Sequence, residues 1–504
     1  MAASKHSESR QFGDFQTPPS LAADVCDVLV RRGIGAPLIL EPTCGRGAFV
    51  KAAITAFPNA ERILGVEINA DYLNELKLDL GRQAATKVEV EQGDFFQTDW
   101  EAVLSSNEGH WLLLGNPPWV TNSELGSLNS NNLPTKTNFQ GHRGFDAITG
   151  KANFDISEWM LLEQMAWLKK RSGWIAMLVK TSVARKVLKQ AWKRHEPVGR
   201  AAMFKIDAKH HFGAAVDACL FVLPVNVGAI SQDCDVYSTL HSDIPVSTIG
   251  FHDGVLVSNV LSYMKQRELI ASNTEYIWRS GVKHDCSKVM ELVASTDGQC
   301  VNGQGDTVSI ENNYVFPMLK SSDVAKGKIT SNRLMIVTQR KVGESTIAIE
   351  TNSPETWRYL SMHSDALDKR GSVIYKDKPR FSVFGVGPYT YAPWKVAVSG
   401  FYKNVRFVKV GPVDDKPTVF DDTIYFLPCF SEEEADFVMS LVQSKPYQEL
   451  MNSMIFPDEK RPVTAELLKR ISLGQVAARL KLSSEYTKFT KVIYQTERER
   501  ELAL

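Results

Sequence analysis

Over the first half of the chain, short apolar runs alternate with stretches whose apolar residues recur at helical spacing. The runs that predict strands lie within 37–49, 62–69, 87–96, 111–114 and 173–180, and the first of them ends in a small-residue turn. The helical stretches lie at 51–57, 71–81 and 156–171. Strands separated by helices predict βαβ units, and therefore an α/β fold with a doubly wound, parallel sheet.

The apolar run at 111–114 ends abruptly. It is followed by Gly115, Asn116, Pro117, Pro118 and Trp119. Neither proline has a backbone N–H, so the strand cannot continue in a parallel ladder. Asn116 and Trp119 are therefore predicted to lie on a stiff turn at the carboxyl end of a strand. In open α/β sheets this edge is where ligands bind.

Three other predicted strands end in residues that suit one small molecule. The turn from Cys44 to Ala48 contains two glycines, which let the backbone approach a ligand closely. Glu67 ends the next strand, where a carboxylate can accept hydrogen bonds from both hydroxyls of a ribose. Asp94 and Phe95 follow the third strand, where they can accept from an exocyclic amine and cover a flat ring.

Each of these features also has a plain structural alternative: a tight strand–helix turn, a surface glutamate, or a turn aspartate beside a core phenylalanine. The spacing favours the functional interpretation, because the features follow one another at successive strand ends. The chain has no GxxxxGK[ST] phosphate loop. Glu41, close to the first turn, suits the cationic end of a cofactor better than a pyrophosphate. Together these residues predict an adenosine pocket.

The order of these segments resembles that of the gamma-class N6-adenine DNA methyltransferases of restriction–modification systems, which use S-adenosyl-L-methionine. The matching segments are 16–19, 41–49, 65–69, 93–96 and 116–119. Looser matches at 153–159 and 209–223 extend the resemblance over roughly 11–225. One departure is Lys180-Thr181, where related enzymes often have a proline turn.

The resemblance implies a Rossmann-like catalytic domain, with no metal, and assigns roles to its residues. The catalytic turn comprises Asn116, Pro117, Pro118 and Trp119. The implied cofactor contacts are Thr17, Glu41, Thr43, Cys44, Gly45, Gly47, Glu67, Asp94, Phe95 and Asn116. The target base is expected to meet Trp119 and Phe212, which takes the place of an aromatic that contacts an extruded base.

The second half of the chain contains a basic segment that the formal net charge of zero conceals. Residues 369–410 contain nine Lys and Arg against one acidic residue, Asp377, with aromatic residues interleaved, and 414–436 is acidic. Basic side chains near phosphates give affinity for DNA. The predicted DNA contacts are Arg380, Lys395, Lys403 and Arg406, and a basic helix at 185–194 can flank the DNA. The alternative is a solvated, β-rich surface whose aromatics form a core.

Length and composition indicate a multidomain globular protein. The chain has 504 residues, of which 43% are hydrophobic and 23% charged. Its seven cysteines are scattered without a CxxC pair, its N-terminus has no apolar secretory segment, and no apolar run has the length of a membrane helix. We therefore expect a cytoplasmic protein with no membrane partner.

We expect four regions along the chain. They are a catalytic domain at 1–245, a connecting region at 246–290, an α+β target-recognition domain at 291–475 and a helical tail at 476–504. The resemblance implies a monomeric, site-specific adenine-N6 methyltransferase that acts on double-stranded DNA, with a cognate endonuclease encoded separately. The alternatives are an RNA or protein-glutamine methyltransferase with the same chemistry, or a non-catalytic DNA-binding subunit.

Overall fold

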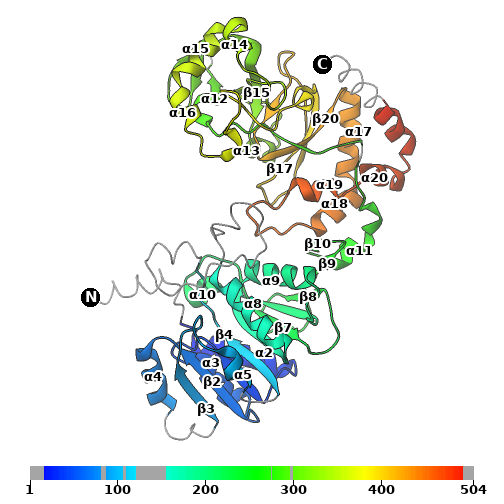
Figure 1. The fold of residues 1–504 in the computed structure, drawn as a ribbon. Coiled ribbons are helices and arrows are strands. Elements are labelled where there is room, and N and C mark those ends of the chain that lie inside the picture. The colour runs from blue at the N-terminus through cyan, green and yellow to red at the C-terminus, as the bar shows by residue number, and fades with distance from the viewer. Residues whose placement is uncertain are drawn as a thin grey trace. The chain divides into compact units, whose positions relative to one another are not determined.

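A computed structural model describes residues 16–80, 87–105, 109–120, 155–273, 275–295 and 299–491 of the chain (Figure 1). These residues form two compact units, divided between Val260 and Leu261. We call them the first and the second unit and describe each by itself. Within the described residues, no helix is both long and apolar enough to cross a membrane.

The first unit is built on a ten-stranded sheet with the order β10-β9-β8-β6-β7-β5-β4-β1-β2-β3. Strands β3, β2, β1, β4 and β5 are parallel, and β7 lies antiparallel between β5 and β6. The bounds are β1 Leu38–Glu41, β2 Arg62–Glu67, β3 Val88–Gln92, β4 His110–Gly115, β5 Ser172–Lys180, β6 Ala201–Ile206, β7 Ala218–Val225, β8 Asp233–Tyr237, β9 Ser247–His252 and β10 Val255–Val257. The predicted doubly wound sheet is confirmed.

Helices cover both faces of this sheet (Figure 1). They are α2 Pro19–Arg31, α3 Ala48–Ala56, α4 Ala70–Leu80, α5 Trp100–Ser105, α8 Ile156–Lys169, α9 Thr181–Lys193 and α10 Ala208–Phe212. The apolar residues of α2 and α3 form one core cluster with alternate residues of the strands, such as Ile39 and Leu112. Each strand of the parallel half thus leads into a helix, which sets the loops at the carboxyl edge.

The second unit contains two mostly antiparallel sheets with helices around them, consistent with the expected α+β fold. The four-stranded sheet has the order β11-β20-β17-β18, and the six-stranded sheet has the order β14-β13-β12-β16-β15-β19. The strand bounds are β11 Arg279–Ser280, β12 Glu291–Ala294, β13 Cys300–Asn302, β14 Thr307–Val308, β15 Val315–Leu319, β16 Arg333–Ile336, β17 Trp394–Ser399, β18 Phe407–Val410, β19 Val419–Phe420 and β20 Ile424–Cys429.

The helices of the second unit lie around these sheets, and α13 lies beside β17 (Figure 1). They are α11 Val260–Lys265, α12 Ser287–Met290, α13 Ser321–Ala325, α14 Ala348–Asn352, α15 Pro354–Met362, α16 Ser364–Asp368, α17 Glu432–Gln443, α18 Lys445–Ser453, α19 Ala465–Lys469 and α20 Leu473–Arg479. In Figure 1, α14, α15 and α16 gather at one end, and α17 to α20 lie beyond β17 and β20.

The structure differs from the sequence analysis in where the first domain ends. Strands β9 and β10 lie within the expected connecting region, 246–290, yet they extend the sheet of the first unit. These strands are short and at the sheet edge, where polar residues such as Ser247 and His252 mask the alternation. The expected tail at 476–504 is described only as far as residue 491, and residues 11–15 and 153–154 of the family segments lie outside the described residues.

Candidate active site

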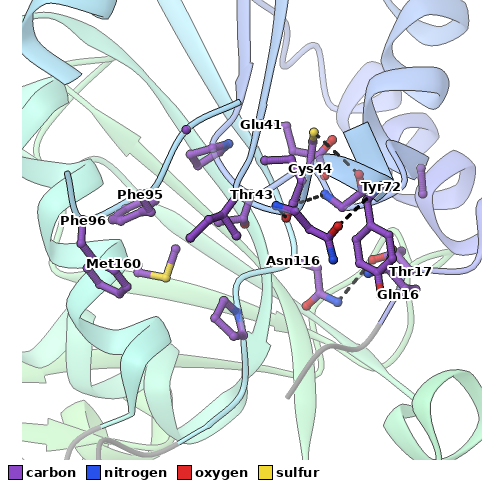
Figure 2. Close-up of a pocket in the computed structure, with 18 residues that line it drawn as sticks. Gln16, Thr17, Glu41, Thr43, Cys44, Tyr72, Phe95, Phe96, Asn116 and Met160 are labelled. Atoms are coloured by element: carbon purple, nitrogen blue, oxygen red, sulfur yellow. Dashed lines mark hydrogen bonds between the residues drawn. The ribbon is translucent and has the colours of Figure 1, made fainter. Parts of the chain in front are cut away.

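A pocket of about 280 Å³ opens at the carboxyl edge of the parallel strands (Figure 2). Its lining comes from the segment before α2, from the ends of β1, β2, β3 and β4 and the residues that follow them, and from the helices α3, α4 and α8. The lining residues are Gln16, Thr17, Glu41, Pro42, Thr43, Cys44, Gly45, Ala48, Glu67, Ile68, Asn69, Tyr72, Gly93, Phe95, Phe96, Asn116, Pro118 and Met160. The pocket therefore lies at the edge that the strand-end residues predicted.

The turn between β1 and α3 requires its two glycines. Gly45 has φ +53° and Gly47 has φ +74°, both in the left-handed region. A Cβ on Gly45 would lie 2.8 Å from Oε1 of Gln16, and one on Gly47 would lie 2.3 Å from a methyl carbon of Leu76. Gly45 thus brings the backbone against the pocket, whereas Gly47 serves the packing of α4 against the turn.

Glu67 holds this turn in place. Its Oε2 accepts from the backbone N–H of Gly45 at 2.7 Å, and its Oε1 accepts from the N–H of Asn69 at 2.8 Å. Because Glu67 ends β2, one side chain fixes the first turn relative to the second strand. Glu67 is 8% exposed and still lines the pocket.

Glu41 gives the pocket a second buried carboxylate. It ends β1, is 4% exposed, and accepts from the N–H of Val50 at 3.1 Å. Burial, together with the nearby charge of Glu67, raises the pKa of Glu41 well above its ordinary value. Within the described residues, no lysine or arginine pairs with Glu41 or Glu67. Two buried acids without a cation make this pocket suited to a positively charged ligand.

One end of the pocket is aromatic and apolar. Phe95, Phe96 and Met160 lie together at this end, across the pocket from Gln16, Thr17 and Tyr72 (Figure 2). The Phe95 ring is backed by Trp100 and Trp167, with ring centroids 5.5 Å away in each case. The pocket thus combines a flat apolar end with acidic and amide groups in its middle, which suits a molecule with a flat ring and a cationic chain.

Asn116 follows directly after β4, and its amide has a defined orientation. Its Nδ2 donates to Oγ1 of Thr17 at 3.3 Å (Figure 2). This bond connects residues that are 99 positions apart, so the N-terminal segment and the end of β4 form one wall of the pocket. The bond directs the NH₂ group of Asn116 toward Thr17, so the side-chain oxygen of Asn116 points away from Thr17.

Trp119 is fixed in the interior. It is 5% exposed, its Nε1 donates to the backbone oxygen of Leu178 at 3.1 Å, and its ring meets that of Phe212 edge to face, with centroids 5.1 Å apart. The backbone oxygen of Val120 accepts from the N–H of Ile156. The turn from Asn116 to Trp119 is therefore held to the end of β5 and to the start of α8.

Lys180, the departure from the family pattern, forms an ion pair at this place. Its Nζ lies 2.7 Å from Oδ2 of Asp155, whose Oδ1 accepts from the N–H of Ser157 at the start of α8. The pair joins the end of β5 to the first turn of α8. The ion pair thus lies at the one position where the chain departs from the expected family pattern.

The structure brings together all the predicted cofactor contacts except Gly47 and Asp94. The carboxylate of Asp94 shapes its own turn instead: Oδ1 accepts from the N–H of Phe96 and Oδ2 from the side-chain amide of Gln97, both at 2.9 Å. That Asp94 also accepts directly from a ligand stays a prediction. Its place in the pocket is taken by its neighbours Gly93, Phe95 and Phe96.

Sequence reasoning missed the pocket residues that belong to helices. Tyr72 lies in the first turn of α4 and Met160 in the second turn of α8, and Ile68 and Asn69 directly follow β2. Their position in the chain could have indicated them, because the helix that follows a parallel strand begins at the same edge of the sheet where the strand ends.

The structure corrects one of the predicted DNA contacts. Lys395 is 1% exposed, and its Nζ donates to the backbone oxygen of Ala392 at 2.6 Å. It lies in β17, between β18 and β20, so its side chain cannot reach a phosphate from this position. Arg380, Lys403 and Arg406 are exposed.

Comparison with known proteins identifies the family. M.NspV, a type II methyltransferase of Nostoc sp., is 42% identical over 468 residues, which are 93% of this chain and 97% of M.NspV. A solved structure of the type IIL restriction–modification enzyme MmeI in complex with DNA has a similar fold, with a TM-score of 0.51 and 11% identity. That match covers 90% of this chain, and this chain spans 64% of the MmeI chain. No family model matches the sequence.

The fold is thus that of a Rossmann-like methyltransferase, and the relative M.NspV places the chain among those of restriction–modification type. The chain belongs to the type II methyltransferases. Its cofactor is S-adenosyl-L-methionine. The pocket fits this molecule, because the buried pair Glu41 and Glu67 matches a cation and Phe95 and Phe96 match a flat ring.

Proposed function

We propose that this methyltransferase is a site-specific adenine-N6 enzyme that acts on double-stranded DNA. In this proposal it extrudes a target adenine from the duplex and transfers a methyl group to its amino nitrogen. Such a modification protects host DNA from a cognate endonuclease encoded separately. The observation that carries the proposal is the Asn116-Pro117-Pro118-Trp119 turn at the end of β4, with its amide oriented beside the cofactor pocket.

An amide next to a carbonyl suits an exocyclic amine. The lone pair of the adenine amino nitrogen is delocalised into the ring, which makes the nitrogen a poor nucleophile. The Asn116 side-chain oxygen and the Pro117 carbonyl can accept its two N–H bonds and favour a pyramidal nitrogen. Thr17 supports this role, because it takes the NH₂ branch of the Asn116 amide. The two prolines keep the acceptors in place before the substrate arrives, so little reorganisation is needed.

The cofactor supplies an electrophilic methyl group on a positively charged sulfur. We assign the ribose hydroxyls to Glu67 and the cationic chain to the region of Glu41. The adenine ring would lie against Phe95, with Ile68 on its other side. The support is that these side chains line one pocket and that its two carboxylates lack a cation within the described residues.

The target base is assigned to Trp119 and Phe212. A base within a duplex cannot reach the active site, and extruding it costs a few kcal/mol of lost stacking. Stacking on an aromatic ring returns about 1–3 kcal/mol per base. The support is the edge-to-face contact between the two rings beside the catalytic turn. Because both rings are buried, base capture in this proposal includes uncovering one of their faces.

DNA is assigned to exposed cations of the second unit, with Arg380, Lys403 and Arg406 as contacts to phosphate. The similarity to MmeI, which was solved in complex with DNA, supports a DNA substrate. We assign the enzyme a monomeric state and the cytoplasm as its place of action.

The test is Asn116→Ala, which should lower methyl transfer to DNA by roughly 100- to 1000-fold, the size of effect seen when one preorganised polar contact is removed. Cofactor affinity, measured by calorimetry, should change only slightly. Asn69→Ser is the matched control, because it removes another amide from the same pocket but keeps an oxygen to accept from the N–H groups of Asp71 and Tyr72.

The product decides the reaction. Nucleosides from DNA treated with the wild-type enzyme should contain N6-methyladenine. Methylation of RNA or of protein glutamine alone, or near wild-type transfer by the Asn116→Ala variant, would contradict the proposal.

A further inference from the structure

Two loops of the second unit carry a group of exposed basic residues. The first, at 339–346, connects β16 to the helices α14–α16, and the second, at 376–383, follows those helices. Arg340 and Lys341 lie on the first loop, and Lys376, Lys378 and Arg380 lie on the second; all five are exposed. We call these two loops together the twin-loop surface.

Buried side chains join the two loops. Gln339, 2% exposed, uses its Oε1 to accept from the N–H of Val383 at 2.9 Å. The hydroxyl of Thr338 donates to the backbone oxygen of Phe381 at 2.7 Å, and that of Thr346 donates to the backbone oxygen of Arg380 at 2.5 Å. Since these bonds lie in a buried or half-buried setting, the loops hold a fixed position relative to each other.

The first loop is also held from within. Gln339 donates through Nε2 to the backbone oxygen of Glu344, and the Glu344 carboxylate accepts from the N–H groups of Arg340 and Lys341. Gly343, at φ +82°, closes the turn. The tip, 340–343, is thereby preorganised although its side chains are exposed, and Val342 at the tip is 47% exposed.

The side chains of this surface are largely available for a polyanion. Within the described residues, no carboxylate pairs with the side chains of Lys341, Lys376 or Lys378. Arg340 lies over the Tyr391 ring, 5.5 Å from its centroid, and the Tyr391 hydroxyl donates to the backbone oxygen of Gln339 at 2.8 Å. The acidic residues nearby are Glu344, which closes the turn, Asp377 between the two lysines, and Asp368, which lies 3.6 Å from the exposed Arg380.

We propose that the twin-loop surface is where the second unit binds duplex DNA, with the 340–343 tip entering a groove to read bases and Lys376, Lys378 and Arg380 holding phosphates beside it. This inference rests on the proposed DNA substrate. A rigid projection that combines an arginine with an apolar side chain suits base edges, because arginine can pair with guanine and an apolar group can meet a thymine methyl. Cations on the flanking loop suit the backbone, where contacts fix the register.

Two variants of the full-length enzyme separate the two roles. The tip variant carries Arg340→Met and Val342→Ala, and the flank variant carries Lys376→Gln and Lys378→Gln. Both keep Gln339, Glu344 and Gly343, which hold the loops. The probes are a duplex with the site methylated in wild-type-expressing cells, found by sequencing their DNA, and a duplex of the same composition with that site scrambled.

The tip variant should lose discrimination: its ratio of affinities for the two duplexes should fall by roughly 5- to 100-fold, the range for one or two misread base pairs. The flank variant should weaken binding to both duplexes by the same factor and reduce the slope of log affinity against log salt by about two. Unchanged thermal unfolding would show that both variants are folded.

Two control variants have matched chemistry elsewhere in the second unit. Arg461 lies over the Phe401 ring at 4.8 Å, as Arg340 lies over Tyr391, and Arg461→Met should leave the affinity ratio unchanged. Lys469→Gln with Lys481→Gln removes two exposed lysines, from α19 and from the turn after α20, that pair with no carboxylate within the described residues, and should leave the salt slope unchanged.

The outcomes separate this inference from the proposed function. If the wild-type enzyme methylates no DNA, the proposed function fails. If the wild-type enzyme methylates a defined site and the tip variant retains the wild-type ratio, the tip does not read bases and the inference is wrong. A salt slope unchanged in the flank variant would overturn the phosphate contacts.

Discussion

Glu67 in the first unit and Lys395 in the second were both predicted to bind a ligand. In the structure, only Glu67 lies where a ligand could reach it. Glu67 lies at the end of a parallel strand and lines the pocket. Lys395 lies within β17 and is buried. The prediction for Glu67 used topology, because parallel strands share one carboxyl edge. The prediction for Lys395 used only the density of charge along the chain, and a charge run does not determine which side chains face solvent.

The same difference appears where the basic and acidic runs of the second unit meet. Lys409, which belongs to the basic run, lies 3.0 Å from the carboxylate of Glu432 and 2.6 Å from that of Asp436. Both acids belong to the acidic run, on α17. The two runs therefore neutralise each other in part, and the cations that remain available are those on loops.

The largest effect expected on cofactor binding contrasts two acids of the first unit. Glu67→Ala removes an acceptor in the pocket and the anchor of Gly45, and should weaken S-adenosyl-L-methionine binding by roughly 10- to 100-fold, in line with charge-assisted hydrogen bonds of about 1.5–3 kcal/mol. Asp94→Ala should have a smaller effect, because its carboxylate shapes a turn. Calorimetric titration of both variants measures the difference. Equal losses would restore Asp94 as a direct contact.

A second test addresses Lys395. Burial lowers its pKa to about 7 from an ordinary 10.5. Between these values the unfolded chain holds a proton that the folded chain does not, so the stability of the second unit should rise with pH by about 1.4 kcal/mol per pH unit. Lys395→Met should remove this dependence. Urea unfolding of the wild type and the variant at two pH values within this range measures the pH dependence of stability. If both proteins show the same dependence, Lys395 is exposed to solvent and not buried.

Glu41 gives a test with the opposite sign. Its pKa is raised from the ordinary 4.5, so the folded, ligand-free chain holds a proton that the unfolded chain loses, and stability falls as pH rises between the two values. Glu41→Gln should therefore raise the melting temperature at neutral pH, by about 2–4 °C per kcal/mol of relief. The same variant should weaken cofactor binding. A lower melting temperature for this variant would contradict the inference that the buried carboxyl group of Glu41 destabilises the ligand-free fold at neutral pH.

The smallest expected effect concerns exposed cations outside the twin-loop surface. Replacing Lys403 and Arg406 by Gln should weaken DNA binding a few-fold and reduce the salt slope by at most about two, since two phosphate contacts are lost. Lys395→Met is the internal control and should leave the slope unchanged, because that side chain is buried. If the salt slope changed only in the Lys395→Met control, the buried lysine and not the exposed loop cations would contact phosphate.

The extent of prediction differs between the units for a physical reason. In the first unit, the period of apolar residues fixed the strands, and the residues after each strand, such as Asn116, had to meet at one edge. Tyr72 and Met160 were missed because helical pocket residues leave no motif. In the second unit, the exposed tip at 340–343 depends on Gln339 and Glu344, whose contacts are made in three dimensions. Nothing in the local pattern distinguishes a buried Gln339 from a surface glutamine.

Cys44 places a thiol among the acidic residues that line the pocket. Burial, and then the charges of Glu41 and Glu67, raise the pKa of its thiol. The thiolate, and not the thiol, is the nucleophilic form of cysteine. A thiolate in a pocket that binds S-adenosyl-L-methionine could accept the methyl group in place of the substrate, which would leave an S-methylated cysteine in the enzyme. Because burial and the two carboxylates favour the protonated thiol, we expect Cys44 to be a poor acceptor for the methyl group of S-adenosyl-L-methionine.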